Sequence, residues 1–220
     1  MRIRQVTVAA GVALLLTACG GSPLDGKTGT QVAASAADAL EKAGAVHIAG
    51  TVDQNGEKGG VDLHLQGSDS SGSITLSGVK LKLVSVDGTA YLQAPGEYWT
   101  SAGLPDQAAT MFADKWVIVP AAAADQFSEF SLKGLVDQFR NPDTKIKDAV
   151  SSDTVQGKDV VVVEQADGST LSVADDEPAY PLELTNKGTS AGTITFSRFG
   201  EKKKITAPAD ALDLSALAGS

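Results

Sequence analysis

The sequence predicts an α+β fold in which one strongly curved antiparallel sheet of about 10–11 strands carries helices on its concave side. Three observations predict it. Apolar and polar residues alternate with a period of two in the first and last thirds of the chain, which is typical of strands with one buried face. Between these thirds, apolar residues recur at helical spacing. A Pro/Ser-rich linker is absent between the two groups of strands, which favours one sheet over two domains.

The amino terminus reads as an export signal. Arg2 and Arg4 precede an apolar run from Val6 to Leu16, which is the layout of a secretory signal peptide. A membrane helix is the alternative, but it needs about 20 apolar residues and this run is too short. The motif Leu16-Thr17-Ala18-Cys19 resembles a bacterial lipobox, which implies cleavage after Ala18 and acylation of Cys19, for example by palmitate.

The chain therefore divides into a lipoprotein signal peptide (1–18), an acylated cysteine with a flexible tether (19–30) and a folded domain (31–220). Residues 20–29 are mostly small and polar, which is typical of a linker and not of a core around a structural cysteine. Fully extended, about ten such residues reach roughly 35 Å. We expect an exported protein, lipid-anchored at the outer face of the cell membrane.

The first element of the domain is a helix followed by a meander of strands. An apolar stripe formed by Val32, Ala36, Leu40 and Ala43 predicts the helix, and Gly44 ends it. Alternation then predicts five strands, at 46–52, 61–66, 73–77, 79–83 and 89–92. Turn signals separate such runs at Asn55-Gly56, Asp69 to Gly72, Asp87-Gly88 and Asp167-Gly168.

The middle of the chain predicts two helices and one short strand. Residues 95–99 read as a loop leading to a helix whose apolar positions are Leu104, Ala108, Met111 and Phe112. A strand follows at 115–120. The second helix carries apolar residues at 132, 135, 136 and 139, with Ser131 as its N-cap and Asn141-Pro142 as its end.

The last third returns to strands. Alternation predicts them at 146–155, 159–165, 170–173, 180–185 and 193–198, and leaves a further strand open at 202–206.

Composition narrows the function classes. The whole chain has a formal charge of −9, and loss of the signal removes two arginines and no acid, so the mature chain is more acidic still. An acidic body disfavours nucleic acid and anionic headgroups as electrostatic partners. The single cysteine leaves no disulfide for the mature domain. A zinc site or a Ser-His-Asp triad would have to use His47 or His64, and no Gly-x-Ser-x-Gly motif occurs, so we expect neither an enzyme nor a cofactor.

The polar residues that stand out have simple interpretations. Alternation places His64 on the solvent-exposed face of its strand, and we expect both His64 and His47 to be solvated. Asp175-Asp176-Glu177 lacks the ligand spacing of a calcium loop and reads as an exposed acidic turn. Lys202-Lys203-Lys204 predicts a solvated hairpin or edge strand, with a headgroup contact as the alternative. Trp99 and Trp116 read as core or rim anchors.

The order of these motifs resembles a family. The lipobox and first helix are followed by Val46–Val52, Gly88–Leu92, Trp99, Lys115–Val117, Pro178–Leu184, Gly192–Ser197 and Ile205–Pro208. This order resembles the actinobacterial LppX/LprAFG-like lipoproteins of the LolA-like superfamily, over nearly all of the mature chain. The resemblance implies a half-open antiparallel β-barrel with helices over its concave face. It also implies a carrier of acylated lipids or lipoproteins, or a chaperone, in the cell envelope.

The leading hypothesis is a cavity between the sheet and the helices that binds and carries a lipid or other apolar ligand. Its predicted lining is Val61, Leu63, Leu65, Ile74, Leu76, Leu81, Leu83, Met111, Phe112, Leu132, Leu135, Val136 and Phe139. The alternative is that these side chains pack together as a solid core. The protein would then be a non-catalytic envelope sensor or assembly factor that docks a protein partner. Nothing in the sequence demands more than a monomer.

Overall fold

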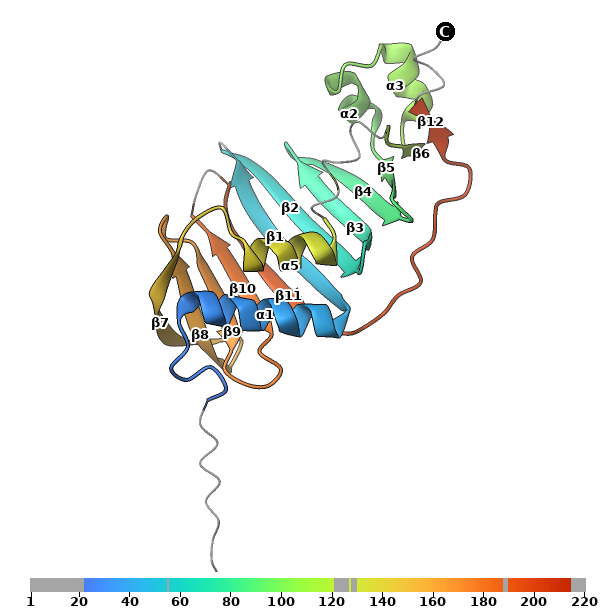
Figure 1. The fold of residues 1–220 in the computed structure, drawn as a ribbon. Helices are drawn as coiled ribbons and strands as arrows, with labels where there is room; N and C mark the ends of the chain where they lie inside the picture. The colour runs from blue at the N-terminus through green and yellow to red at the C-terminus, as the bar shows by residue number, and fades with distance from the viewer. Residues whose placement is uncertain (1–21, 55, 121–126, 128–129, 188–189, 215–220) are drawn as a thin grey trace, which may run out of the picture.

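The computed structural model describes residues 22–54, 56–120, 127, 130–187 and 190–214. Figure 1 shows a curved sheet with two helices, α1 and α5, on its concave face. The elements are α1 (Gly29–Ala43), β1 (Ala45–Gln54), β2 (Glu57–Gln66), β3 (Asp69–Leu76), β4 (Val79–Val86), β5 (Thr89–Gln93), α2 (Gly96–Ser101), α3 (Asp106–Phe112), β6 (Trp116–Ile118), α5 (Leu132–Arg140), β7 (Ile146–Val155), β8 (Lys158–Gln165), β9 (Thr170–Ala174), β10 (Pro181–Asn186), β11 (Ser190–Ser197) and β12 (Leu212–Asp213). The predicted α+β class with one curved sheet is confirmed.

The sheet is a single open layer of twelve strands in the order β12-β6-β5-β4-β3-β2-β1-β11-β10-β9-β8-β7. All neighbouring pairs are antiparallel except β12 with β6, which is parallel. The first and last groups of strands meet where β1 pairs with β11, with Ile48 opposite Phe196. The two regions of alternation thus form one sheet, because the chain returns after α5 to the free side of β1.

Helix α1 owes its position to strong caps at both ends. The Thr28 side chain accepts the backbone N–H of Gln31, and the Gln31 side chain accepts the N–H of Thr28, which together form a capping box. Gly44 ends the helix in the left-handed conformation with a φ of 70°. Its buried face consists largely of alanines, so the helix lies close against β1, β7, β8 and β9.

Tight turns join many of the strands and fix their register. Asp87-Gly88 has positive φ at both residues, as a two-residue hairpin turn requires. Ser77-Gly78 and Gln156-Gly157 have the same geometry. The turn predicted at Asp69 to Gly72 is wrong, because these residues lie inside β3 and pair with β2. The reversal before β3 is formed by Gly67 and Ser68, and Gly67 takes the positive φ.

The middle helices differ from the sequence prediction in two respects. The sequence predicts a loop at 95–99, but residues 96–101 form the short helix α2. Helices α2 and α3 do not cover the concave face; they pack on each other at the far end of the sheet, beside β5 and β6 (Figure 1). Phe112 contacts Trp99 there, with ring centroids 6.0 Å apart.

The strand left open at 202–206 does not form. Residues 199–211, which we call the C-terminal strap, run past the start of β1 and the end of β2 and then beside the sheet to β12 (Figure 1). The N–H of Gly200 donates to the carbonyl of Ala45 (2.9 Å), and the N–H of Lys203 donates to Gln66 Oε1 (3.0 Å). The lysine run at 202–204 is exposed, but it lies in this strap and not in a hairpin or edge strand.

The prediction of a flexible tether at 19–30 is wrong for residues 22–30, the part that the structure describes. Residues 22–28, which we call the N-terminal turn, pack against the body. Leu24 is 2% exposed and belongs to the main core. The Ser22 hydroxyl donates to Asp175, and the Lys27 N–H donates to the Leu24 carbonyl at 3.2 Å. One buried leucine among small polar residues was enough to fix the segment. Cys19 and the signal peptide lie outside the described residues.

Candidate functional site

The concave face is packed solid where the helices cover it. The four leucines at the centre of β2 and β4 are at most 1% exposed: Leu63, Leu65, Leu81 and Leu83. From the other side, α5 contributes Leu132, Leu135, Val136 and Phe139, all buried. Phe139 meets Phe196 of β11 edge to face, with ring centroids 5.9 Å apart. These eight predicted lining residues therefore form a core and not an open tunnel.

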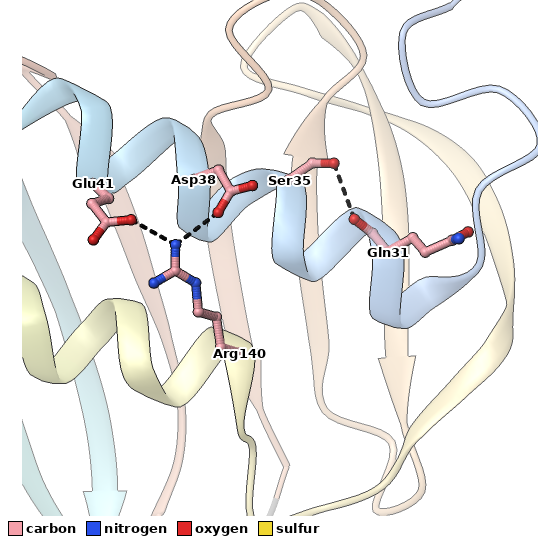
Figure 2. A network of polar contacts seen from close by, with 5 residues as sticks. All are labelled: Gln31, Ser35, Asp38, Glu41 and Arg140. Atoms are coloured by element: carbon pink, nitrogen blue, oxygen red, sulfur yellow. Dashed lines mark hydrogen bonds and ion pairs between the residues drawn. The ribbon is translucent and has the colours of Figure 1, made fainter.

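Helix α5 is held to α1 by one arginine, as Figure 2 shows. Arg140 Nη2 donates to Asp38 Oδ1 at 2.7 Å and to Glu41 Oε2 at 2.6 Å. Hydrogen bonds to both carboxylates raise the pKa of Arg140 above its already high ordinary value. At the other end of α1 in the same view, the Ser35 hydroxyl donates to the Gln31 carbonyl at 3.0 Å. The two helices that cover the packed region thus form one unit.

The concave face is open at one end, beyond the helices. An apolar pocket of about 220 Å³ lies there, where β1 and β3 end and β2 and β4 begin. Its floor is formed by Val61, Ile74 and Ile194, and Phe130, just before α5, closes one side. The remaining lining residues are Val52, Glu57, Gly59, Gly60, Thr75, Leu76 and Ser77.

Two glycines, Gly59 and Gly60, line this pocket, and others lie beside it in the same rows of the sheet. Register and alternation place Gly50, Gly59 and Gly192 on the concave face, in the outer rows of the sheet. A Cβ at Gly50 would lie 2.1 Å from the Thr193 carbonyl oxygen, and one at Gly192 would lie 2.1 Å from that of Thr51. Here the sheet coils so tightly that only glycine fits. The glycines were missed as site residues, although glycine at inward positions of a strand is a readable signal of close approach.

The structure divides the predicted lining residues into three groups. Val61, Ile74 and Leu76 line the open pocket, and Leu76 is 40% exposed at its rim. The four leucines and the four α5 residues are packed beneath the helices. Met111 and Phe112 lie elsewhere, because α3 packs at the far end of the sheet. Met111 is 57% exposed there, so its predicted place in the cavity is wrong.

A second, polar pocket lies at the C-terminal end of α5. It has a volume of about 520 Å³, and its lining includes carboxylates and amides from α5, the segment that follows it and the β8–β9 turn. The Ser169 N–H donates to Asp167 Oδ1 at 2.9 Å, which lowers the pKa of that carboxyl and keeps it ionised. An acyl chain needs an apolar lining, so the smaller pocket and not this one suits a lipid tail.

The convex face holds a histidine that sequence patterning misplaced. His64 is 2% exposed, although alternation predicts a solvated position. The C-terminal strap covers it through the contact of Lys203 with Gln66. Among the described residues neither ring nitrogen of His64 has a hydrogen-bond partner. Burial lowers the pKa of His64, and the nearby Lys203 lowers it further.

His47 lies directly opposite His64 on the neighbouring strand. It is less solvated than alternation predicts, because its Nδ1 lies 3.1 Å from Ser197 Oγ and its Nε2 lies 2.8 Å from Asp62 Oδ1. Its side chain is 16% exposed. These contacts orient the ring along the sheet surface.

The acidic turn at 175–177 is exposed except for Asp175, which accepts the Ser22 hydroxyl. Within the described residues no group of three or more His, Cys, Asp or Glu side chains is placed to hold a metal ion. Trp99 is buried and donates from Nε1 to the Ala94 carbonyl at 3.2 Å, as expected of a core anchor. In the same part of the chain, every helix is too short or too polar to cross a bilayer.

Two solved structures share the fold. LprF from Mycobacterium bovis superposes with a TM-score of 0.52 at 17% identity, covering 84% of this chain and 100% of LprF. The lipoprotein LppX from Mycobacterium tuberculosis superposes with a TM-score of 0.51 at 13% identity, covering 81% of this chain and 98% of LppX. A scan of family models and a search of curated proteins find no match. The expected resemblance to the LppX/LprAFG-like lipoproteins is thus confirmed in the fold.

Proposed function

We propose that this protein is an exported lipoprotein, anchored at the outer face of the cell membrane through acylated Cys19, that binds and carries a lipid or other apolar ligand. The observation that carries the proposal is the apolar pocket at the open end of the concave face. Its walls are aliphatic and aromatic, and Gly59 and Gly60 are part of its lining. Apolar walls with little polar lining suit an acyl chain or a similar group.

The volume of the pocket limits what it holds. A space of about 220 Å³ matches roughly seven water molecules at ~30 Å³ each. Sites for drug-sized ligands enclose about 300–1,000 Å³. The pocket therefore takes one end of an apolar chain. Deeper binding requires α5 to move away from the sheet, and Phe130, at the start of that helix, is the residue that such a movement displaces first.

The test is lipid content of the purified mature protein, measured by organic extraction and mass spectrometry. We expect co-purified lipid in the unaltered domain and much less in Val61→Trp, which fills the pocket. Met111→Trp adds the same ring at an exposed position far from the pocket and should retain the lipid. Leu76→Lys places a charge at the exposed rim and provides a second variant that should fold. An unaltered domain that is always empty contradicts the proposal.

A second candidate function rests on the solid core. Leu63, Leu81 and Leu83 are completely buried under the helices, which suits a domain that needs no ligand. Such a domain would act as an envelope sensor or assembly factor through its surface. It predicts that the empty protein, cross-linked in its own membranes, is recovered with one stoichiometric protein partner, and that Val61→Trp does not affect this recovery.

A further inference from the structure

The N-terminal turn fixes how far the body of the protein can stand from its anchor. The described chain is held from Ser22 onward, since the Ser22 hydroxyl bonds to Asp175 and Leu24 is buried in the core. Only Gly20 and Gly21 separate Ser22 from the acylation site at Cys19. The three residue-to-residue steps from 19 to 22 span at most about 11 Å, instead of the roughly 35 Å expected of a free tether.

We propose that this short connection holds the body upright on the membrane that anchors it. The end formed by the N-terminal turn and the acidic turn at 175–177 then rests on the headgroups, and the apolar pocket faces away from the bilayer. The proposal rests on the acylation of Cys19, which is part of the proposed function. A headgroup layer is about 5–7 Å thick, so a reach of about 11 Å leaves little room to turn over.

The arrangement of the ends supports this orientation. Figure 1 shows residues 22–28 at one end of the molecule and the β1–β2 and β3–β4 connections at the opposite end of the sheet. Glu57, which begins β2, and Ser77, which lies in the β3–β4 connection, line the apolar pocket. The anchored end and the pocket mouth are thus separated by the length of the strands.

The chemistry of the anchored end specifies the surface it fits. A groove of about 440 Å³ lies between the N-terminal turn, the outer face of α1 and residues 177–179. It carries both signs of charge, because Lys27, Lys42, Asp38 and Glu177 are among its lining residues. A zwitterionic phospholipid headgroup offers a phosphate and an ammonium group to such a pair of charges. Exposed Asp25 and Asp176 add negative charge, which disfavours anionic headgroups. The connection, more than attraction, keeps this end at the surface.

This orientation has a consequence for ligand exchange. A pocket that faces away from the anchoring bilayer takes and delivers its ligand on the side of the envelope space. A long tether would instead let the same pocket touch the membrane directly. The burial of Leu24 therefore decides between these two modes of ligand exchange. Its release would free residues 22–28 and lengthen the connection between the body and the membrane.

The test uses the acylated full mature protein in phosphatidylcholine and phosphatidylethanolamine vesicles. Cys19 is the only cysteine in the sequence, so an introduced thiol is a unique labelling site once Cys19 is acylated. A fluorophore is placed at Asp176→Cys near the anchor, at Glu57→Cys by the pocket mouth, or at Met111→Cys on α3. Quenching by headgroup-labelled lipid should be several-fold stronger at position 176 than at the other two positions.

Two further variants test whether the short connection and the buried Leu24 hold this orientation. A Gly/Ser insertion of about ten residues between Gly21 and Ser22 leaves the body intact and raises the reach to about 45 Å, so it should abolish the difference in quenching between the labels. Leu24→Ser should reduce the difference in the same direction if the domain remains folded.

The outcomes separate the orientation from the anchor. Equal quenching at positions 176 and 57 in the acylated protein overturns the orientation alone. A mature protein whose mass lacks acyl chains and which does not float with vesicles overturns both the anchor and the orientation. Lipid content of the pocket is measured separately and bears on neither result.

Discussion

The two ends of the concave face are built from the same strand pattern and differ in what covers them. Under α1 and α5, inward side chains of β2 and β4 such as Leu63 and Leu83 are fully buried. At the open end, Leu76 on the neighbouring strand β3 also points inward but is 40% exposed. The difference shows that alternation selects a face of the sheet, whereas the length and position of α5 decide whether that face is core or binding surface.

The strongest test of this contrast compares one leucine from each end. Leu63→Ala should lower the free energy of unfolding by about 2–5 kcal/mol, because it opens a cavity in a packed region. Leu76→Ala should lower it by about 0.5–1 kcal/mol, because the side chain is already partly in water. Urea unfolding followed by circular dichroism measures both. Similar losses in the two variants would mean that the two ends are not different.

The sequence predicted the faces and most elements because their causes are local. Alternation depends on neighbouring residues, and the caps of α1 and α5 lie within three residues of the groups they bind. The predicted N-cap at Ser131 is confirmed, since its side chain accepts the N–H of Gly134. The apolar stripe predicted for α3 is only partly right, because Phe112 is buried but Met111 is 57% exposed and Leu104 precedes the helix. The place of α3 beside β6 depends on how the chain turns after β5.

The features that sequence reasoning missed depend on contacts between distant segments. His64 is buried because the strap, more than 130 residues downstream, runs past the end of its strand. Leu24 belongs to the same core as Val173 and Ala179 from the last third of the chain, and its neighbour Ser22 bonds to Asp175. The open pocket depends on where α5 begins relative to the strand ends. Periodicity carries no information on any of these distances.

A second test examines the open end through its glycines. A Cβ at Gly59 would lie 3.0 Å from Val52 Cγ2 and 3.1 Å from the Thr75 carbonyl oxygen. Gly59→Ala should therefore push Val52 into the pocket and cost about 1–3 kcal/mol of unfolding free energy, with a clear loss of bound lipid. Gly96→Ala is the control, because its new Cβ would meet Ala113 Cβ at an ordinary 3.5 Å. If Gly59→Ala carries as much lipid as the unaltered protein, the lipid is not bound in this pocket.

A third test probes the convex face behind the packed end. His64 has a pKa below its ordinary 6.5, mainly through burial, so the unfolded chain takes up a proton before the folded protein does. Stability should therefore fall as the pH drops below about 6.5, until the lowered folded-state pKa is passed. Of the charged groups around the ring, Lys203, Arg198 and His47 lower its pKa and Glu201 raises it.

His64→Leu should remove this part of the pH dependence and raise stability at neutral pH, because an unpartnered buried polar group is replaced by an apolar one. Unfolding free energies at a series of pH values from about 7.5 to 5.5 measure the effect. Lys158→Gln, which changes an exposed residue of β8 that is not among the charged groups around His64, is the control. If the unfolding free energy of His64→Leu keeps its full dependence on pH, carboxylates elsewhere and not His64 cause that dependence.

The smallest expected effect concerns the ion pairs that hold the packed end closed. Arg140→Met removes the contacts of α5 with Asp38 and Glu41 on α1, and these side chains are largely exposed, so global stability should change little. Lys133→Met removes the Lys133–Asp137 pair within α5 and leaves the contact with α1 intact. If the Arg140 contacts close the concave face, hydrogen exchange of the α5 amides should accelerate in Arg140→Met and not in Lys133→Met. Faster exchange together with more bound lipid in Arg140→Met would show that the packed end becomes binding surface when α5 is released. Equal exchange in the two variants would show that the apolar packing of Phe139 and Leu135, and not the Arg140 contacts, keeps the concave face closed.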